Sequence, residues 1–306
     1  MRIVFMGTPE FSIPTLDTLV QAGYEIGAVV TAPDKPAGRG NKLRPSPIKT
    51  FALSKGLSVL QPVKLRDPAF IEALEAIAPD LMVVVAFRML PEMVWSIPKI
   101  GTFNLHASLL PDYRGAAPIN WVLINGEKQT GLTTFFIDKQ IDTGSLLLRT
   151  EVDIPYEWTA GDLHDRMMTQ GAELVLETVK GLEAGSLTAR PQDENLYQHP
   201  APKIFKEDCR INWDQPQDKV YHFIRGLSPY PTAFTMLEDK IFKVYKAREA
   251  TGDASQPGTI KVENDQLFVA CQEGWLELLE IQLQGKKRIS SGDFVRGYRG
   301  SLEKME

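Results

Sequence analysis

Apolar and polar residues alternate in blocks through the first half of the chain. Compact apolar runs at Arg2–Met6, Ile26–Thr31 and Leu81–Ala86 are typical of strands that are covered on both faces, as in a parallel sheet. Between the first two runs, apolar residues recur at helical spacing from Ile13 to Val20. This alternation of strands and helices predicts a doubly wound α/β domain with a mostly parallel sheet.

The same kind of pattern continues along this domain. It predicts a strand at Gly101–His106 and the start of a helix at Pro118–Asn125. Further strands are predicted at Gly131–Phe136 and Leu146–Asp153, and a long helix should run from Ala160 to about Ala184.

The character of the sequence changes after that helix. Residues 185–210 are polar, contain prolines and lack periodicity, as expected of a linker. Short β-rich segments follow at Ile241–Tyr245, Leu267–Ala270 and Trp275–Ile281, with turn residues between them. We therefore expect a first domain at 1–187, a linker at 188–208 and a small β-barrel domain at 209–306.

Composition narrows the class of protein. No apolar stretch is long enough to cross a bilayer, and no cleavage site follows the apolar N-terminal run. With only two cysteines, a reducing cytoplasm is the expected compartment. Four scattered histidines without ligand spacing predict no metal site. The net charge of -5 argues against a protein that coats nucleic acid by bulk positive charge, although it permits a local basic surface.

The densest polar cluster lies at Asn104–Pro111. Alternation along the predicted strand places Asn104 and His106 on one face, at the carboxyl end where open α/β sheets bind ligands. An isolated pair of this kind would more often bond only to a neighbouring loop. Here a loop punctuated by proline and glycine follows at 111–115, and such loops commonly shape sites.

A second candidate is Asp142, which stands shortly before Gly144. By spacing alone this arrangement indicates turn chemistry. Asp142 becomes a catalytic candidate only if the fold brings it beside His106.

Several motifs together carry a family resemblance. They are Gly7-Thr8-Pro9-Glu10-Phe11, Asn104-Leu105-His106 with Ser108–Pro111, Arg114–Pro118, and Asp142-Thr143-Gly144. In this order they resemble the methionyl-tRNA formyltransferase family, over essentially the whole chain. The Asn-x-His and Asp-x-Gly motifs are shared with the wider group of formyltetrahydrofolate-using transferases. Asp34–Lys49 is more discriminating, because it resembles the loop by which the tRNA-using family meets the acceptor end.

This resemblance implies both a fold and an activity. The fold would be a Rossmann-like formyltransferase domain followed by an OB-like barrel that contacts tRNA. The activity would be transfer of the formyl group of 10-formyltetrahydrofolate, as co-substrate, to the free amino group of initiator methionyl-tRNA, for translation initiation. Family habit implies a monomer, with no metal and no membrane partner.

The resemblance also implies site residues, in three groups. The catalytic set would be Asn104, His106 and Asp142; the folate would lie along Ser108, Leu109, Leu110 and Pro111 and near Phe87 and Arg88; and tRNA would meet Lys35, Arg39, Lys42, Arg44, Lys286, Lys287 and Arg288. Many relatives have an aromatic-glycine pair where this chain has Phe87-Arg88, and Arg88 adds bulk and charge to that part of the folate site.

Formyl transfer to an amine gives each catalytic candidate a task. The neutral amine attacks the formyl carbon, an oxyanion develops, and a proton leaves the nitrogen. The amide of Asn104 can donate to the oxyanion without changing charge, and His106 can donate when it is protonated. Asp142 would then orient His106 and accept the proton, directly or through water.

The basic segments admit two interpretations. Any basic loop is most simply a solvated surface, and the row Lys286-Lys287-Arg288 fits a solvated turn. A long irregular loop such as 34–49 inside a compact domain is uncommon unless it is functional, and cationic side chains on it could follow a phosphate backbone. The family resemblance favours RNA, with a basic groove on one face of the C-terminal domain.

Other functions are compatible with parts of this pattern. A sugar-nucleotide formyltransferase would share the Asn/His/Asp set, and water in place of the amine would give formyltetrahydrofolate hydrolysis. A nicotinamide-dependent oxidoreductase is disfavoured, because the first turn, Gly7–Phe11, lacks G-x-G-x-x-G spacing. A non-catalytic RNA-binding protein is disfavoured by the intact Asn104, His106 and Asp142 set.

Overall fold

The computed structural model describes residues 1–37, 42–253 and 255–306. They form two compact units. Unit 1 comprises residues 1–115, 130–152 and 164–200, and unit 2 comprises residues 116–129, 153–163 and 201–306. The boundaries expected at 187 and 209 stay a prediction. Residues 116–129 and 153–163 pack with the C-terminal part of the chain.

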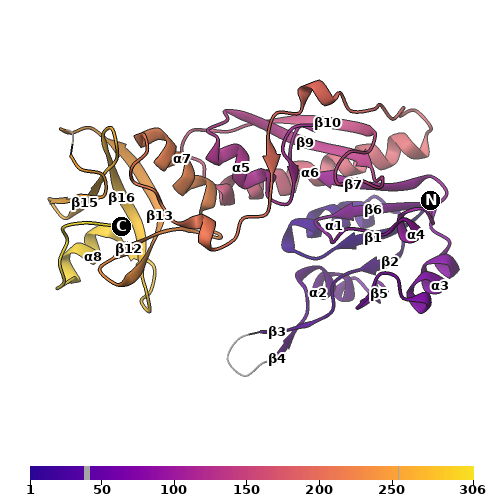
Figure 1. Ribbon diagram of the computed structural model, residues 1–306. Coiled ribbons are helices and arrows are strands. Elements are labelled where there is room, and N and C mark those ends of the chain that lie inside the picture. The colour runs from indigo at the N-terminus through magenta and orange to yellow at the C-terminus, as the bar shows by residue number, and fades with distance from the viewer. Residues whose placement is uncertain (38–41, 254) are drawn as a thin grey trace. The chain divides into compact units, whose positions relative to one another are not determined.

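Unit 1 is built on a sheet of seven strands in the order β10-β9-β7-β6-β1-β2-β5 (Figure 1). The strands of this sheet are β1 (Arg2–Gly7), β2 (Glu25–Val30), β5 (Val59–Leu60), β6 (Leu81–Val85), β7 (Gly101–His106), β9 (Gln129–Phe136) and β10 (Leu146–Asp153). Strands β5, β2, β1, β6 and β7 pair in parallel, whereas β9 runs antiparallel to β7. The expected doubly wound, mostly parallel sheet is confirmed.

Helices connect these strands. They are α1 (Ile13–Gln21), α2 (Pro47–Ser54), α3 (Pro68–Ile77), α4 (Glu92–Trp95) and the long α6 (Ala160–Glu183), whose first residues belong to unit 2. All of β6 is buried, which explains its continuous run of valines. Gly171 in α6 lies against Leu105 of β7, where a Cβ would approach the Leu105 Cδ2 to 2.7 Å. The glycine that interrupts the helical pattern thus lets the helix pack closely on the sheet at this point.

Parallel pairing brings three chain segments to one edge of the sheet. Gly7 is in register with Val85, and Val85 is in register with Leu105. The turn after Gly7, the loop after Val85 and the side chain of His106 therefore lie at the carboxyl edge, where α/β sheets of this kind bind ligands.

The described residues of the basic segment at 34–49 include regular structure that the sequence did not indicate. Instead of an irregular loop, the segment contains the antiparallel pair β3 (Lys35–Ala37) and β4 (Lys42–Arg44), followed by α2. Figure 1 shows this pair projecting from the sheet beside β2 and β5. At its base, the Lys49 ammonium lies 2.7 Å from the Asp34 carboxylate, and the Thr31 and Ser46 hydroxyls are bonded at 2.8 Å. The hairpin is thus fixed where it leaves the sheet.

The segment expected as a linker is folded along unit 1. Leu146 at the start of β10 exchanges backbone hydrogen bonds with Arg190. Further along, the short strand β11 (Pro200–Ala201) pairs with β8 (Arg114–Gly115). This part of the chain therefore contacts the sheet edge and the loop after β7, instead of passing through solvent.

Unit 2 contains an antiparallel sheet in the order β12-β13-β16-β15-β14, with β17 paired to β16. Its elements are α5 (Pro118–Ile124), α7 (Gln217–Leu227), β12 (Ala233–Leu237), β13 (Lys240–Ala250), β14 (Ile260–Glu263), β15 (Gln266–Ala270), β16 (Trp275–Leu283), β17 (Ile289–Ser290) and α8 (Ser291–Gly297). The strands expected from the β-rich segments are confirmed within β13, β15 and β16.

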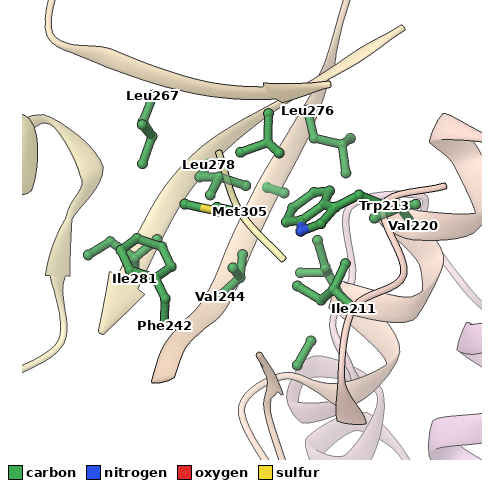
Figure 2. Close-up of a cluster of buried hydrophobic side chains, with 14 of the residues drawn as sticks. Ile211, Trp213, Val220, Phe242, Val244, Leu267, Leu276, Leu278, Ile281 and Met305 are labelled. Atoms are coloured by element: carbon green, nitrogen blue, oxygen red, sulfur yellow. The ribbon is translucent and has the colours of Figure 1, made fainter. Parts of the chain in front are cut away.

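The last residues of the chain join the two ends of this sheet. Met305 bridges Leu237 of β12, and the Gly258 carbonyl just before β14 accepts a hydrogen bond from the Met305 N–H. The Ile260 N–H of β14 donates to Glu303 in the same tail. Met305 is 1% exposed and lies in the core among Leu278, Val244 and Trp213 (Figure 2). The tail thus closes the curved sheet into the expected small barrel.

Among the described residues, no helix combines the length and the apolar character needed to cross a membrane.

Candidate active site

His106 ends β7 at the carboxyl edge of the sheet and is 6% exposed. Its Nε2 lies 2.9 Å from the carbonyl oxygen of Tyr113. A carbonyl oxygen can only accept, so Nε2 must carry the hydrogen. The ring is therefore held by the loop after β7, and its Nδ1 is left for other partners.

Asp142 comes to His106 from the loop between β9 and β10. Its Oδ2 lies 3.7 Å from Nδ1 of His106, and its side chain is 15% exposed. The stronger bond of this carboxylate is with the Gly115 N–H, which donates to Oδ2 at 3.0 Å. The structure therefore brings together two residues that lie 36 positions apart in the sequence. The hydrogen bond that orients His106 is made with the Tyr113 carbonyl. The sequence had suggested Asp142 for this role.

Asn104 occupies the other polar position on the same face of β7. It is half-buried and in register with Val84 of β6 and Phe135 of β9. Within the described part of the chain its side-chain amide has no hydrogen-bond partner, whereas His106 and Asp142 are both bonded. An amide fixed on a strand with its donors unused can serve a ligand.

Gly144 explains the Asp-x-Gly motif. A Cβ at this position would lie 1.7 Å from the Phe136 carbonyl oxygen, so no larger residue fits while the loop lies against β9. Asp142 itself adopts φ +57°, a left-handed conformation that aspartate tolerates better than most residues. The Asp138 carboxylate adds a bond from the Thr143 hydroxyl at 2.8 Å. These local features turn the loop back so that Asp142 meets His106.

Replacing Gly144 with alanine tests this packing. We expect Gly144→Ala to lower the unfolding free energy by about 1–3 kcal/mol, because the loop must leave its contact with β9 to admit the methyl group. Thermal unfolding measures the change, and Gly297→Ala, where a Cβ meets nothing within 4 Å, is the control. An unchanged Tm for Gly144→Ala would mean that the loop is not packed as described.

The segment expected to hold the folate forms a rigid wall beside His106. Ser108 and Leu110 are both fully buried. The Ser108 hydroxyl donates to the Asp112 carbonyl at 2.6 Å, while the Thr133 hydroxyl bonds the Ser108 carbonyl and the Leu110 N–H. Leu109 is half-buried, and Pro111 is buried. The Ser108 hydroxyl is thus already engaged, and any contribution of this segment to ligand binding comes from its backbone and from the Leu109 side chain.

The loops on either side of this edge offer apolar surface. Residues 86–93 expose Met89 and Met93, and the Asp142 loop exposes Ile141; each of the three side chains is at least half exposed. The two loops face each other, since the Lys139 ammonium lies 3.3 Å from the Glu92 carboxylate. Exposed apolar side chains beside polar groups can bind a ligand that has both apolar and polar surface.

Arg88 does not carry a free charge into this surface. Its guanidinium donates to the carbonyls of Pro62 and Val63 and lies over the Phe87 ring at 5.6 Å. Burial lowers the pKa of Arg88, although a guanidinium stays charged at any physiological pH. The bulk and charge expected at this position are thus turned toward the loop at 62–63.

The cations expected to meet tRNA are partly engaged. Lys35 and Arg44 lie opposite each other on β3 and β4, and both are exposed. Lys42 belongs to β4, whereas Arg39 lies outside the described residues. In unit 2, Lys286 and Lys287 are exposed, but the Arg288 guanidinium pairs with Glu280 and stacks on Tyr245 at 4.3 Å.

Comparison with known proteins gives this geometry its context. A family model for formyl transferase matches residues 1–179, and one for the formyl transferase C-terminal domain matches residues 203–299. A methionyl-tRNA formyltransferase from Parabacteroides distasonis is 49% identical over 316 residues, which cover 99% of this chain and 97% of that protein. One from Flavobacterium johnsoniae is 46% identical, covering 99% of this chain and 98% of its own.

Solved structures share the fold at low identity. HypX from Aquifex aeolicus in complex with tetrahydrofolic acid has a TM-score of 0.67 and 18% identity, over 99% of this chain and 50% of that one. The matched family models together cover nearly the whole sequence, and the relatives match it from end to end. The chain therefore belongs to the formyl transferase family, in the group of the methionyl-tRNA formyltransferases.

Proposed function

We propose that this protein transfers the formyl group of 10-formyltetrahydrofolate to the amino group of initiator methionyl-tRNA. The observation that carries the proposal is the approach of Asp142 Oδ2 to within 3.7 Å of His106 Nδ1, with Asn104 two residues before His106 on the same strand, β7. The methionyl-tRNA formyltransferases that match the chain from end to end support the choice of substrate.

The carrier supplies an already activated formyl group, so no side chain of the protein needs to be acylated. The apolar surface of Met89, Met93 and Ile141 fits the flat ring system of a folate. In this proposal the folate lies between this surface and the wall at 108–111, with Phe87 and Arg88 at its border.

The three polar groups divide the work of acyl transfer. The Asn104 amide donates to the oxygen on which negative charge develops. His106, held by the Tyr113 carbonyl through Nε2, presents Nδ1 toward Asp142 and the reacting atoms. Asp142 lies beside this nitrogen and accepts the proton that leaves the attacking amine, directly or through water.

Acceptor choice separates this function from its nearest rival. Purified protein with 10-formyltetrahydrofolate should formylate methionyl-tRNA at least about 1000-fold faster, as kcat/KM, than a nucleotide-linked amino sugar. Comparable rates, or a preference for the sugar, would assign the chain to sugar formylation instead. We further propose that the protein works in the cytoplasm as a monomer without a metal.

Two groups of cations are proposed to hold the tRNA. In the segment at 34–49 they are Lys35, Arg39, Lys42 and Arg44, and at the turn before β17 they are Lys286, Lys287 and Arg288. Lys286 and Lys287 should contribute more than Arg288, because Glu280 already neutralises that guanidinium locally.

Replacing Lys286 and Lys287 together with alanine should weaken tRNA binding and lower the slope of log K against log salt by about 1–2, since each phosphate contact releases counterions. Adding Arg288→Ala should change the slope less. Filter binding across a salt series measures both. The exposed pair Lys64 and Lys180, replaced in the same way, serves as the charge-matched control. A slope equal to that of the control would remove this turn from the tRNA surface.

A further inference from the structure

A single glutamine from the segment after α6 fastens the loop that carries Asp142. The side-chain amide nitrogen of Gln192 donates to the Asp142 carbonyl at 2.8 Å and to the Gly144 carbonyl at 2.9 Å. Both donor hydrogens of the amide are thereby used, one on each side of Thr143. Gln192 is half-buried, which strengthens these bonds relative to exposed ones.

The oxygen end of the same amide is held by Arg114. Its guanidinium donates to the Gln192 Oε1 from Nη2 at 2.6 Å and from Nε at 3.2 Å. Arg114 is in turn fixed by a bidentate pair with Glu194, at 2.7 and 3.0 Å, and lies over the Tyr197 ring at 5.3 Å. Hydrogen bonding with Arg114 lowers the pKa of Glu194, so this pair persists at neutral pH.

Arg114 also stands between the two backbone groups that hold the catalytic pair. The residue before it, Tyr113, accepts the bond from His106, and the residue after it, Gly115, donates to Asp142. Gln192 and Arg114 therefore join the loop that orients His106 to the loop that presents Asp142. The 3.7 Å separation of His106 and Asp142 depends on these two loops, which are also joined by the bond from the Gly115 N–H to the Asp142 carboxylate.

The segment is anchored at a second point near its end. His199 stacks on Tyr113 at 5.1 Å, and its Nδ1 lies 3.0 Å from the Asp112 carboxylate. Burial opposes ionisation of Asp112, but the hydrogen bonds from the His199 ring and from backbone N–H groups outweigh it and lower the pKa of this carboxyl. The position of Gln192 is thus set from both sides, by β10 through Arg190 and by the 112–113 loop through His199.

We propose that Gln192, held by Arg114, is a positioning residue that keeps the Asp142 carboxylate against His106. The inference rests on the function proposed above, since it concerns the rate of that reaction. Gln192 touches neither the reacting atoms nor the imidazole; it acts only through the backbone of the Asp142 loop.

Gln192→Glu tests the proposal with little change of shape. A carboxylate would keep the contact with Arg114 but would turn the two donor bonds into repulsion between oxygens. We expect kcat for methionyl-tRNA formylation to fall by about 10- to 100-fold, as a displacement of about 1 Å would cause. The KM for methionyl-tRNA should stay within about twofold of wild type. Gln198→Glu, an exposed glutamine in the same segment, is the matched control and should keep wild-type kcat.

A double-mutant cycle separates positioning from general loosening. In an Asp142→Asn background, Gln192→Glu should lower the single-turnover rate by less than twofold, because the carboxylate through which it acts is gone. If Gln192→Glu reduces folded protein, the neutral Gln192→Met should show the same kcat loss. A folded variant with wild-type kcat, or an equal loss in both backgrounds, would overturn the role of Gln192. A wild-type protein that forms no formylmethionyl-tRNA would instead overturn the proposed function.

Discussion

Asp142→Asn should lower the single-turnover rate of formyl transfer by about 1000-fold. The substitution keeps the shape of the side chain, and its amide oxygen can still accept the bond from the Gly115 N–H. What it removes is the negative charge 3.7 Å from His106 Nδ1 and the group proposed to take the proton from the amine. The loss should appear in the chemical step, with both substrates saturating, because Asp142 is not proposed to bind either substrate.

A surface pair in the same unit provides the control. His164 and the exposed Asp165 on α6 also place an imidazole beside a carboxylate, at 3.0 Å. Asp165→Asn should leave the transfer rate within about twofold of wild type, since this pair lies on an exposed part of the helix. If Asp142→Asn were equally harmless, the carboxylate would have no part in the reaction.

Asn104→Ala is expected to lower the same rate by about 100- to 1000-fold, the usual effect of removing one oxyanion donor. The truncation leaves no buried partner unpaired, because the Asn104 amide has no hydrogen bond within the described residues. The unfolding temperature should therefore change little while kcat falls. This combination distinguishes a donor aimed at the reacting oxygen from a structural strand residue.

The opposite pattern would contradict that role. A Tm lowered by several degrees together with a near-normal transfer rate would make Asn104 a structural residue. Asn104→Asp sharpens the comparison: it replaces the donor with a negative charge, and should be at least as slow as Asn104→Ala because the charge repels the developing oxyanion.

The sheet could be predicted because its pattern is local. The valine run of β6 and the apolar run of β1 indicate strands buried on both faces, and both strands lie at the centre of the sheet. The same holds for the placement of Asn104 and His106 on one face of β7, which follows from alternation alone. The barrel strands were likewise indicated, but not the closing role of Met305, which depends on contacts with segments more than 40 residues away.

The connections between loops could not be predicted. The motifs around Asp142 suggested a turn, and only the family resemblance joined that turn to His106, since spacing carries no information on a contact made across a sheet edge. Gln192 lies in a polar, proline-containing segment whose composition resembles a linker. Gln192 donates two hydrogen bonds to backbone carbonyls. Every residue has a backbone carbonyl, so the sequence does not indicate which carbonyls a glutamine will bond.

The basic residues of the surface could be predicted from the sequence, but the acidic residues that pair with them could not. Lys49 and Arg288 belong to the two basic segments, yet Asp34 and Glu280 pair with them. A sequence gives the sum of charges, whereas the register of a hairpin or helix decides which charges meet.

The activity proposed for this site is the transfer of a formyl group from folate to methionyl-tRNA. The most direct test mixes purified protein with 10-formyltetrahydrofolate and methionyl-tRNA and measures both products in one reaction. We predict equal amounts of tetrahydrofolate and formylmethionyl-tRNA, and neither product when one substrate is left out. Tetrahydrofolate released without a matching amount of formylmethionyl-tRNA would mean that water is the acceptor, and would contradict the account.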